Sequence, residues 1–250
     1  ERTNENAGKK RKLCALRTFF RYLLKHQYLE SNPAAVVDTP PIREKPIVRL
    51  EPSEVSELLE SVERGDRLTK HESTYHRYTR LRDLAIISLL LGTGIRISEC
   101  IGLNRSDIDF DNRSFRIIRK GGNESILYFS GEVETVLRDY AEVRKAMQPR
   151  IGHEDAFFLS MQNRRITARA VQNLVSKYAQ RVTPLKHITP HKFRSTYGTE
   201  LYKKTGDIYL VADILGHKDV NTTRRHYADM IEERRKAAAE AVRLREDKKT

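Results

Sequence analysis

A histidine and a tyrosine lie near the end of the chain, and both side chains could do chemistry. They belong to the stretch LGHKDVNTTRRHYAD, residues 215–229, in which His217 follows Gly216 and Tyr227 comes ten residues later. A tyrosine hydroxyl can attack an electrophile and form a covalent intermediate when a nearby group takes its proton. The simpler alternative is that His217 follows a helix end and Tyr227 packs in a core, because most of the 11 tyrosines must be structural.

The motif TGIRISE, residues 93–99, places an arginine after a glycine-rich segment. Gly92 and Gly94 are predicted to bracket a sharp turn, so that Arg96 starts a short helix. Glu99 follows three residues later, where its carboxylate could hold the guanidinium group in place. An ordinary exposed Arg–Glu pair has the same spacing, although the apolar stretches on both sides of the motif disfavour a solvated face.

The motif HKFR, residues 191–194, places a histidine and an arginine three residues apart, and therefore on one face of a helix. Thr189 and Pro190 predict a helix start directly before it. His191 would then lie in the first turn, where free backbone N–H groups favour an anion and keep the imidazole neutral. The alternative is a capping histidine beside a solvated Arg194.

A lysine, Lys120, stands in the motif RKGGNES, residues 119–125, at the predicted tip of a β-hairpin. A lysine on a glycine-rich turn most often serves only solubility. A mobile turn could equally carry an ammonium donor into a cleft when a substrate binds.

Together these side chains suit phosphoryl transfer. Two guanidinium groups match the non-bridging oxygens of a phosphate, and a tyrosine hydroxyl can attack its phosphorus. A neutral histidine can take a proton, and a lysine can protonate the departing oxygen. Because the motifs contain no paired carboxylates and no metal cluster, fixed cations would take the place of Mg²⁺. The set comprises Arg96, Lys120, His191, Arg194, His217 and Tyr227.

The composition favours a polyanionic partner. The 250 residues include 47 Lys+Arg and 34 Asp+Glu, a formal net charge of 47 − 34 = +13. Nucleic acid is the first candidate partner and an acidic membrane surface the second. No apolar run approaches the roughly 18 residues of a membrane span. Cys14 and Cys100 lie in apolar helical patterns without CxxC spacing, which indicates a reducing compartment and argues against structural zinc.

Periodicity predicts a mostly helical protein with one small antiparallel sheet. Residues 107–130 alternate apolar and polar side chains between turn signals, which predicts three antiparallel strands. Asp207 is predicted to begin a helix that Gly216 ends. The polar residues 63–80 are expected to form a loop or an insertion. Helical periodicity covers residues 9–28, 50–62, 80–103, most of the chain from 131 onward and an alanine-rich charged tail.

The first predicted helix carries many cations beside an apolar stripe that one helix cannot bury alone. Residues 39–50 follow it with three prolines and no periodicity, which indicates an interdomain linker. The cations are candidate DNA-binding residues: Lys9, Lys10, Lys12, Arg17, Arg21 and Lys25.

Five motifs in order resemble those of the tyrosine recombinases, the lambda-integrase type that includes Xer recombinases and transposon integrases. They are TGIRISE, RKGG, HKFR, LGH and the Tyr227 segment, within residues 48–235. Each motif is weak alone, but five in this order are highly specific. The resemblance implies part of a helical core-binding domain at 1–39, a linker at 40–49, a tyrosine recombinase catalytic domain at 50–235 and a helical tail at 236–250.

The resemblance also assigns roles at the scissile phosphate. Arg96 and Arg194 would clamp it, and Glu99 would hold an arginine in place. Tyr227 would attack the phosphorus, forming a 3′-phosphotyrosyl bond and freeing a 5′-hydroxyl.

Three further residues would serve proton transfer and phosphate binding by resemblance. Lys120 would protonate the leaving oxygen, His191 would act as the base, and His217 would hydrogen-bond the phosphate. Two positions depart from the usual pattern: Ser195 stands where many members carry histidine, and His226 precedes the tyrosine. Neither removes a catalytic group, but both leave the subfamily open.

The implied partners are double-stranded DNA recombination sites, further copies of this chain in a tetramer on DNA, and accessory DNA-bending proteins. No cofactor, metal or membrane is implied, and the implied location is the bacterial cytoplasm, at the nucleoid. An Ala-rich tail would dock on a neighbouring subunit or remain a solvated helix.

Within the family, an integrase of a mobile element is favoured over an Xer-like resolvase of chromosome or plasmid dimers. This preference rests on the insertion at 63–80 and on an apparently missing upstream region. A type IB topoisomerase would share the chemistry without joining two sites. A DNA-binding architectural protein without catalysis is the alternative of another class, and it would keep its function after a Tyr227→Phe substitution.

Overall fold

A computed structural model describes residues 6–41, 48–66, 68–119, 121–217 and 220 of the chain. The chain divides into two compact units, residues 1–46 and 47–250. The boundary falls inside the proline-containing segment predicted to be a linker.

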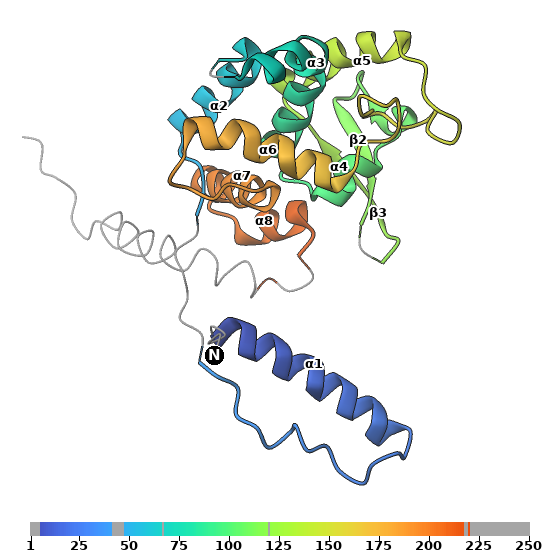
Figure 1. Ribbon diagram of the computed structural model, residues 1–250, viewed down its shortest axis with the longest axis vertical. Coiled ribbons are helices and arrows are strands. Elements are labelled where there is room, and N and C mark those ends of the chain that lie inside the picture. Colours follow the sequence, from blue (N-terminus) through green and yellow to red (C-terminus); the bar gives the residue numbers. More distant parts are fainter. Residues whose placement is uncertain (1–5, 42–47, 67, 120, 218–219, 221–250) are drawn as a thin grey trace, which may run out of the picture. The chain divides into compact units, whose positions relative to one another are not determined.

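The first unit contains one helix, α1 (Asn6–Lys25), among its described residues (Figure 1). Leu13 is buried, whereas Leu16 and Phe19 are 50% and 55% exposed, so most of the apolar side chains of α1 remain uncovered within the unit. Arg17 differs from the other cations of the helix. Its guanidinium group donates to the backbone oxygen of Ala34 at 3.1 Å and to the hydroxyl of Thr39 at 3.0 Å, and so ties the following segment to α1.

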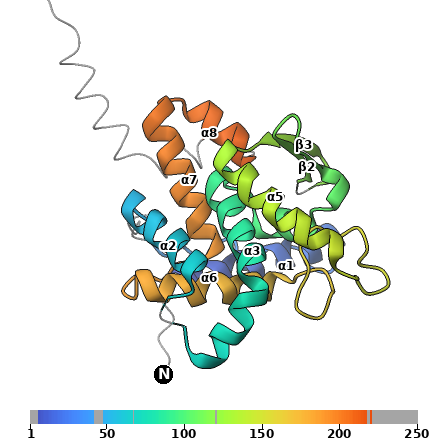
Figure 2. The ribbon, with the colours of Figure 1, turned by 90° about the horizontal axis from the view of Figure 1, so that it is seen from above.

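The second unit is mostly helical with a small antiparallel sheet, as predicted (Figures 1 and 2). No helix in the described ranges is both long and apolar enough to cross a membrane. Its elements are α2 (Pro52–Arg64), α3 (Lys70–Thr93), α4 (Ile97–Gly102), the short 3-10 helix η1 (Arg105–Asp107), β1 (Ile108–Asp109), β2 (Ser114–Ile118), β3 (Glu124–Tyr128), α5 (Gly131–Ala146), α6 (Ala168–Val182), α7 (Pro190–Thr205) and α8 (Ile208–Leu215).

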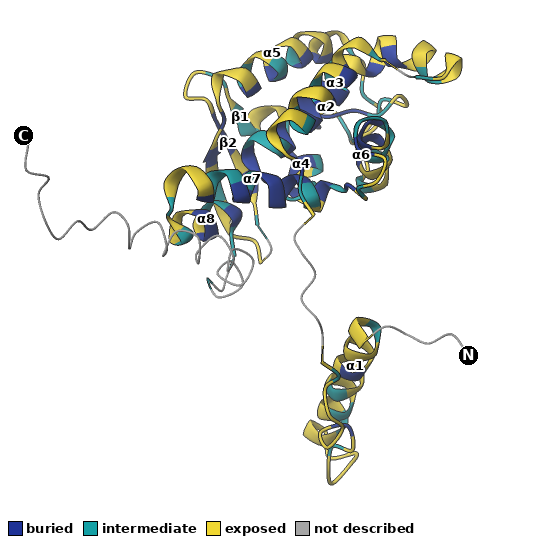
Figure 3. Cartoon of the chain, turned by 90° about the vertical axis from the view of Figure 1, so that its left-hand side faces the viewer, coloured by how far each residue is buried: buried dark blue, intermediate teal, exposed yellow. Residues whose placement is uncertain are grey.

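The core is organised around α3. Residues 83–90 of α3 are buried on all sides, and α3 contacts α2, α5, α6 and α7. Figure 3 shows the dark, buried surfaces of these helices. A helix apolar on all faces is expected only where neighbours surround it. The sheet has the order β1-β2-β3, and β2 lies centrally with Phe115 opposite Leu127 and Ile117 opposite Ser125. Phe115 and Ile117 alternate onto the buried face.

The prediction of a loop at residues 63–80 was wrong for most of that segment, because α3 begins at Lys70. The start is set by a capping box: the hydroxyl of Thr69 accepts from the backbone N–H of Glu72, whose carboxylate accepts from the backbone N–H of Thr69. Most of its side chains are polar and exposed, whereas His76 and Thr79 are buried and make tertiary or local hydrogen bonds. The Nε2 atom of His76, for example, lies 2.7 Å from the backbone oxygen of Val62.

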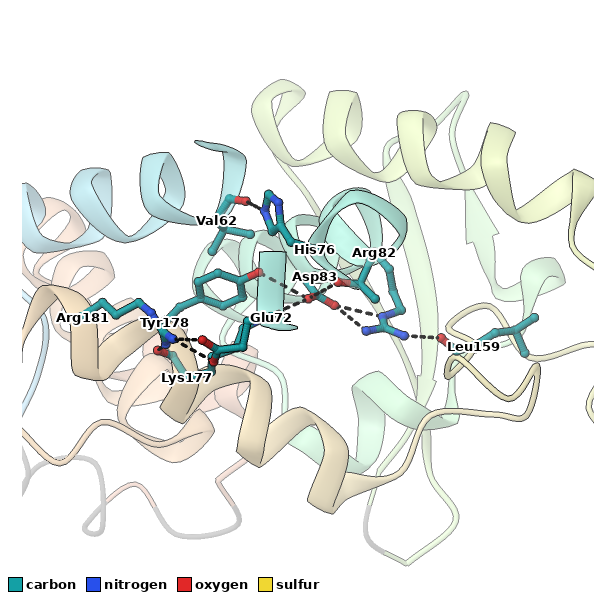
Figure 4. A network of polar contacts seen from close by, with 10 residues as sticks. Val62, Glu72, His76, Arg82, Asp83, Leu159, Lys177, Tyr178 and Arg181 are labelled. Atoms are coloured by element: carbon teal, nitrogen blue, oxygen red, sulfur yellow. Dashed lines mark hydrogen bonds and ion pairs between the residues drawn. The ribbon is translucent and has the colours of Figure 1, made fainter. Parts of the chain in front are cut away.

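A buried polar network centred on Asp83 of α3 joins this helix to α6 (Figure 4). The carboxylate of Asp83, 2% exposed, accepts from Arg82 and from the hydroxyl of Tyr178 at 3.5 Å. Arg82 also donates to the backbone oxygen of Leu159 at 3.1 Å. Burial raises the pKa of the Tyr178 hydroxyl, which keeps it neutral. The network therefore serves packing between helices.

The predicted turn between Gly92 and Gly94 is shorter than expected. Gly92 lies inside α3, and a Cβ atom there would come 2.5 Å from Cγ2 of Val133, so glycine allows α5 to approach closely. Only Gly94 ends the helix, with a φ of +64° that favours glycine.

Candidate active site

The first candidate arginine stands at the start of α4. Arg96 is the N-cap residue, and the buried carboxylate of Glu99 accepts from its backbone N–H at 2.7 Å and from its Nη1 at 2.8 Å. Arg96 Nη2 donates to the backbone oxygen of Gly216 at 3.0 Å. The guanidinium group is therefore held from two sides, and 34% of the side chain remains exposed.

The second candidate arginine lies on the buried face of α7. Thr189 is the N-cap of this helix and Pro190 its first residue, as predicted. Arg194 is 5% exposed and donates to the backbone oxygen of Gly94 at 2.7 Å and to that of Leu215. The two candidate arginines, 98 residues apart in sequence (194 − 96), therefore meet at the same end of α8.

The end of α8 is the structural centre of the candidate site. Asp207 caps the start of the helix by accepting from the backbone N–H groups of Tyr209 and Leu210 at 2.8 and 3.0 Å. Gly216 ends it with a φ of +60°. The last carbonyl groups of a helix have no partner within it and form the negative end of its dipole. At the end of α8, carbonyl groups accept hydrogen bonds from arginine side chains.

A third arginine that the sequence analysis did not single out reaches the same place. Arg119 follows β2; its Nη2 donates to the backbone oxygen of Ile214 at 3.0 Å and its Nε to the hydroxyl of Ser125 at 2.8 Å. A signal was present in the sequence, since Phe115, Ile117 and Arg119 alternate and so share the inward face of the hairpin. A cationic side chain at an inward-facing strand position needs a specific hydrogen-bond partner.

The two candidate histidines differ in placement. His191 is exposed in the first turn of α7, as predicted. His217 directly follows the end of α8, where its backbone N–H donates to the oxygen of Ala212 at 2.9 Å and its side chain is half-buried. The structure therefore brings His217 to the helix end that Arg96 and Arg194 contact.

A described tyrosine also lies beside this cluster. A Cβ atom on Gly94 would come 2.5 Å from Cδ1 of Tyr197, so the ring packs directly on that glycine. Burial raises the pKa of the Tyr197 hydroxyl above its ordinary value. A hydroxyl that is harder to ionise suits packing better than nucleophilic attack.

Several predicted residues lie outside the described part of the chain. These are Lys120, His226, Tyr227 and the tail from 236 to 250. The predicted DNA-binding cations lie in the first unit, on α1. A cavity of about 330 Å³ lies elsewhere, lined by residues of α3, α5 and the loop around Met161, and contains none of the candidate site residues.

Comparison with known proteins gives consistent matches. The sequence model of the Phage integrase family matches residues 49–234. The tyrosine recombinase XerC of Actinobacillus pleuropneumoniae serotype 7 (strain AP76) is 28% identical over 213 residues, covering 85% of this chain and 65% of the relative. XerC of Vibrio vulnificus (strain YJ016) is 30% identical over 230 residues, covering 89% and 68%. The chain thus spans about two thirds of the length of these relatives, and slightly less for the first.

Solved structures share the fold. XerH site-specific recombinase bound to a palindromic difH substrate matches with a TM-score of 0.74 and 21% identity, covering 94% of this chain and 67% of that one. The Tn1549 transposon integrase in complex with transposon right end DNA matches with a TM-score of 0.70 and 22% identity, covering 92% and 79%. Because the family model spans well over half of the residues, this chain belongs to the phage integrase family, the tyrosine recombinases.

Proposed function

We propose that this chain is a site-specific DNA recombinase, which cleaves and rejoins DNA strands through a 3′-phosphotyrosyl intermediate. The observation that carries the proposal is the meeting of Arg96, Arg194 and the His217 loop at the end of α8, in a chain of this family. Residues far apart in sequence converge there with the side-chain types that phosphoryl transfer needs.

Arg96 and Arg194 bind the non-bridging oxygens of the scissile phosphate. Their hydrogen bonds to backbone carbonyl groups fix the guanidinium planes. Glu99 fixes Arg96 further, and its own charge is offset by bonds from two donors of that residue. Preorganised cations stabilise the charge that develops in the transition state without having to reorient.

Tyr227 is the proposed nucleophile. Its hydroxyl oxygen attacks phosphorus and gives up its proton to His191, while the bond to the 5′-oxygen of the next nucleotide breaks and Lys120 protonates that oxygen. His217 donates a hydrogen bond to the phosphate. Rejoining runs the same steps in reverse, with a 5′-hydroxyl of a partner strand as nucleophile.

The proposed substrate is double-stranded DNA. The XerH protein is bound to a palindromic difH substrate and the Tn1549 integrase to transposon right end DNA. The net charge of +13 here suits a DNA partner as well. The cations of α1 other than Arg17, which is engaged within its own unit, contact the DNA backbone in this proposal. Residues 1–39 form part of a core-binding domain, joined by the linker at 40–49 to the catalytic domain, 50–235. Active chains form a tetramer on DNA to which the 236–250 tail contributes, and accessory DNA-bending proteins assist.

Two biological roles fit this chemistry. Integration or excision of a mobile element is supported by the likeness to a transposon integrase. An Xer-like resolvase is supported by the name of the curated relatives, XerC. Most of the segment 63–80 belongs to helix α3, and its helical structure does not separate the two roles. The location of the cleaved sites, at element ends or at a chromosomal dimer-resolution site, separates the two roles.

Covalent trapping in EDTA tests the proposal. Nicked suicide duplexes, tiled across the DNA that flanks the gene, are mixed with the chain and with Tyr227→Phe, then run on a denaturing gel. The unsubstituted chain should form an adduct that maps the cleaved site, and Tyr227→Phe should bind the same duplex without an adduct. Binding of both proteins without any adduct would instead identify a DNA-binding architectural protein.

A further inference from the structure

We infer that Arg119 is a positioning residue for the cleavage step, which joins the β2–β3 turn to the end of α8 and so holds the proposed acid, Lys120, at the phosphate site. The inference rests on the proposed function. Arg119 itself does not touch the phosphate in this scheme. It acts through the residue that follows it in the chain.

Arg119 closes the turn with its backbone. Its N–H donates to the oxygen of Asn123 at 2.8 Å, and its oxygen accepts from the N–H of Gly122 at 3.0 Å. Gly121 and Gly122 have φ values of +102° and +84°, a conformation that favours glycine. The residue between Arg119 and Gly121 is Lys120. Because Lys120 is bonded directly to Arg119 in the chain, fixing the backbone of Arg119 limits where Lys120 can lie.

The side chain of Arg119 fixes this turn to α8. Nε donates to Ser125 on the opposite strand, and Nη2 donates to the oxygen of Ile214. Arg96 and Arg194 bind the next two carbonyl groups, those of Gly216 and Leu215. Three arginines thus bind the carbonyl groups of three consecutive residues. Arg119 is the one that links the β2–β3 turn to the helix end that the other two also contact.

The contact between Arg119 and the helix end is very close. A Cβ atom on Gly216 would come 1.6 Å from Nη1 of Arg119, so only glycine leaves room for the guanidinium group. Gly216 therefore serves both the left-handed helix end and the approach of Arg119. His217 comes next in the chain, which places the anchored turn beside a second proposed catalytic segment.

The environment of Arg119 is not that of an ordinary surface cation. Its Nη1 is buried without a hydrogen-bond partner, and no salt bridge to its side chain occurs among the described residues. A buried donor without an acceptor is costly, so its retention needs a reason. Arg116 on the same strand is the contrast: it is exposed and pairs with the carboxylates of Asp107 and Glu124. The end of the α8 dipole supplies the negative potential for Arg119 instead.

Replacing the leaving oxygen with sulfur tests this inference. A thiolate departs without a proton, so a duplex with sulfur at the bridging 5′ position no longer needs the acid. We would measure single-turnover adduct formation on oxygen and sulfur duplexes by the unsubstituted chain, Lys120→Met and Arg119→Met. Arg116→Met is the matched control.

Arg119→Met should lose about 100-fold in rate on the oxygen duplex, the lower range of what general acid catalysis contributes. On the sulfur duplex it should come close to the unsubstituted rate, as Lys120→Met should, while Arg116→Met stays unchanged on both. Ser125→Ala, a milder change, should show a smaller loss that sulfur also restores. Thermal unfolding and DNA affinity should move little.

An equal loss on both duplexes, or no loss, would overturn the role of Arg119, because a role in folding or phosphate binding is not relieved by sulfur. The proposed function would survive that result if Lys120→Met is still restored. If Lys120→Met is not restored, the assignment of the acid fails and the inference fails with it. If the unsubstituted chain forms no adduct, the proposed function itself fails.

Discussion

At the scale of single residues, buried arginines in this protein donate to backbone carbonyl oxygens. Arg144, 2% exposed, donates to the oxygens of Ala156 and Glu154, and Arg194 donates to that of Gly94. A carbonyl acceptor satisfies the N–H groups but leaves the positive charge in place. Arg144 lies buried away from the candidate site, whereas Arg96 lies at the end of α8 with 34% of its side chain exposed, where it can face a phosphate.

Glu99→Gln should lower the rate of adduct formation by about 10- to 100-fold, the equivalent of losing one hydrogen bond to a charged group. An amide can replace only one of the two oxygens that accept from Arg96, and its NH₂ group would face a donor. Single-turnover trapping measures the effect. Glu134→Gln, which breaks the Glu134–Arg138 pair on α5, is the control and should leave the rate unchanged. An unaffected Glu99→Gln would show that Arg96 needs no support.

At the scale of elements, α3 positions the site because neighbouring helices are built onto it. Gly94 ends it, Arg96 follows, and α7 lies against it with Arg194 bonded to the oxygen of Gly94. Close approach of α5 depends on Gly92. Small changes in α3 should therefore be felt both in stability and in the geometry of the arginines.

Gly92→Ala should destabilise the fold by about 1–3 kcal/mol, the usual cost of overpacking, because the new Cβ meets Val133. In most helices the same substitution stabilises by about 1 kcal/mol. Denaturant unfolding of Gly92→Ala, Val133→Ala and the double variant measures the coupling. Val133→Ala should remove the penalty. Gly102→Ala in α4 is the control, since its Cβ would meet no atom within 4 Å; equal effects at both glycines would contradict the packing argument.

The start of α3 should contribute a pH-dependent stability. The backbone N–H of Thr69 and then Arg181 hold the pKa of the Glu72 carboxyl at about 2, below its ordinary value of 4.5. A lowered folded-state pKa stabilises the fold fully above the ordinary value and loses that contribution as the pH falls toward 2. The contribution should be at most about 1 kcal/mol because the pair is partly solvated.

Glu72→Gln should therefore be less stable than the unsubstituted chain near neutral pH, and the gap should close as the pH falls below about 4.5. Chemical unfolding at a series of pH values measures it. Arg181→Gln should weaken the same pH dependence, because it removes the side-chain partner. A gap that stays constant down to the lowest pH would rule out Glu72 as its source.

At the scale of the whole molecule, charge is distributed between the two units in different ways. The cations of α1 lie on a helix whose apolar side chains are mostly uncovered within its unit. Among the described residues of this unit, Arg17 is the cation of α1 whose side chain donates to the following segment. In the second unit, arginines converge on one helix end. The first arrangement suits non-specific attraction to a polyanion and the second suits one phosphate.

Salt dependence separates these two kinds of cation. If Lys9, Lys10 and Lys12 each neutralise one phosphate, replacing all three with serine should reduce the slope of log K against log[salt] by about 3 × 0.9. Arg17→Ser should leave the slope nearly unchanged, because Arg17 is engaged within its own unit. Fluorescence anisotropy on one duplex from 50 to 200 mM salt measures both slopes. A slope that the triple variant does not change would exclude the start of α1 from the DNA interface.

The sequence by itself determined most helices and strands and the family, because these depend on residues close together in the chain or on motifs in a fixed order. Helix starts at Thr189 and Asp207, the end at Gly216 and the alternating strands depend on neighbours within a few residues, so they can be predicted from a short window. The ordered motifs likewise pointed to the tyrosine recombinases. The helix at 70–80 was missed because most of its side chains are polar and exposed, so they form no apolar stripe. Its tertiary contacts are with residues elsewhere, such as Val62 and Arg181.

Only the tertiary structure decided that three arginines meet at the end of α8. Arg96 and Gly216 are separated by 120 residues, Arg119 and Ile214 by 95, and Arg194 and Gly94 by 100. No periodicity or spacing rule spans such separations, because the contacts depend on how α3, α7 and the hairpin pack around one core. Arg119 shows the limit most clearly: its strand phase indicates an inward cation, but its partner, a helix carbonyl, exists only after the chain has folded.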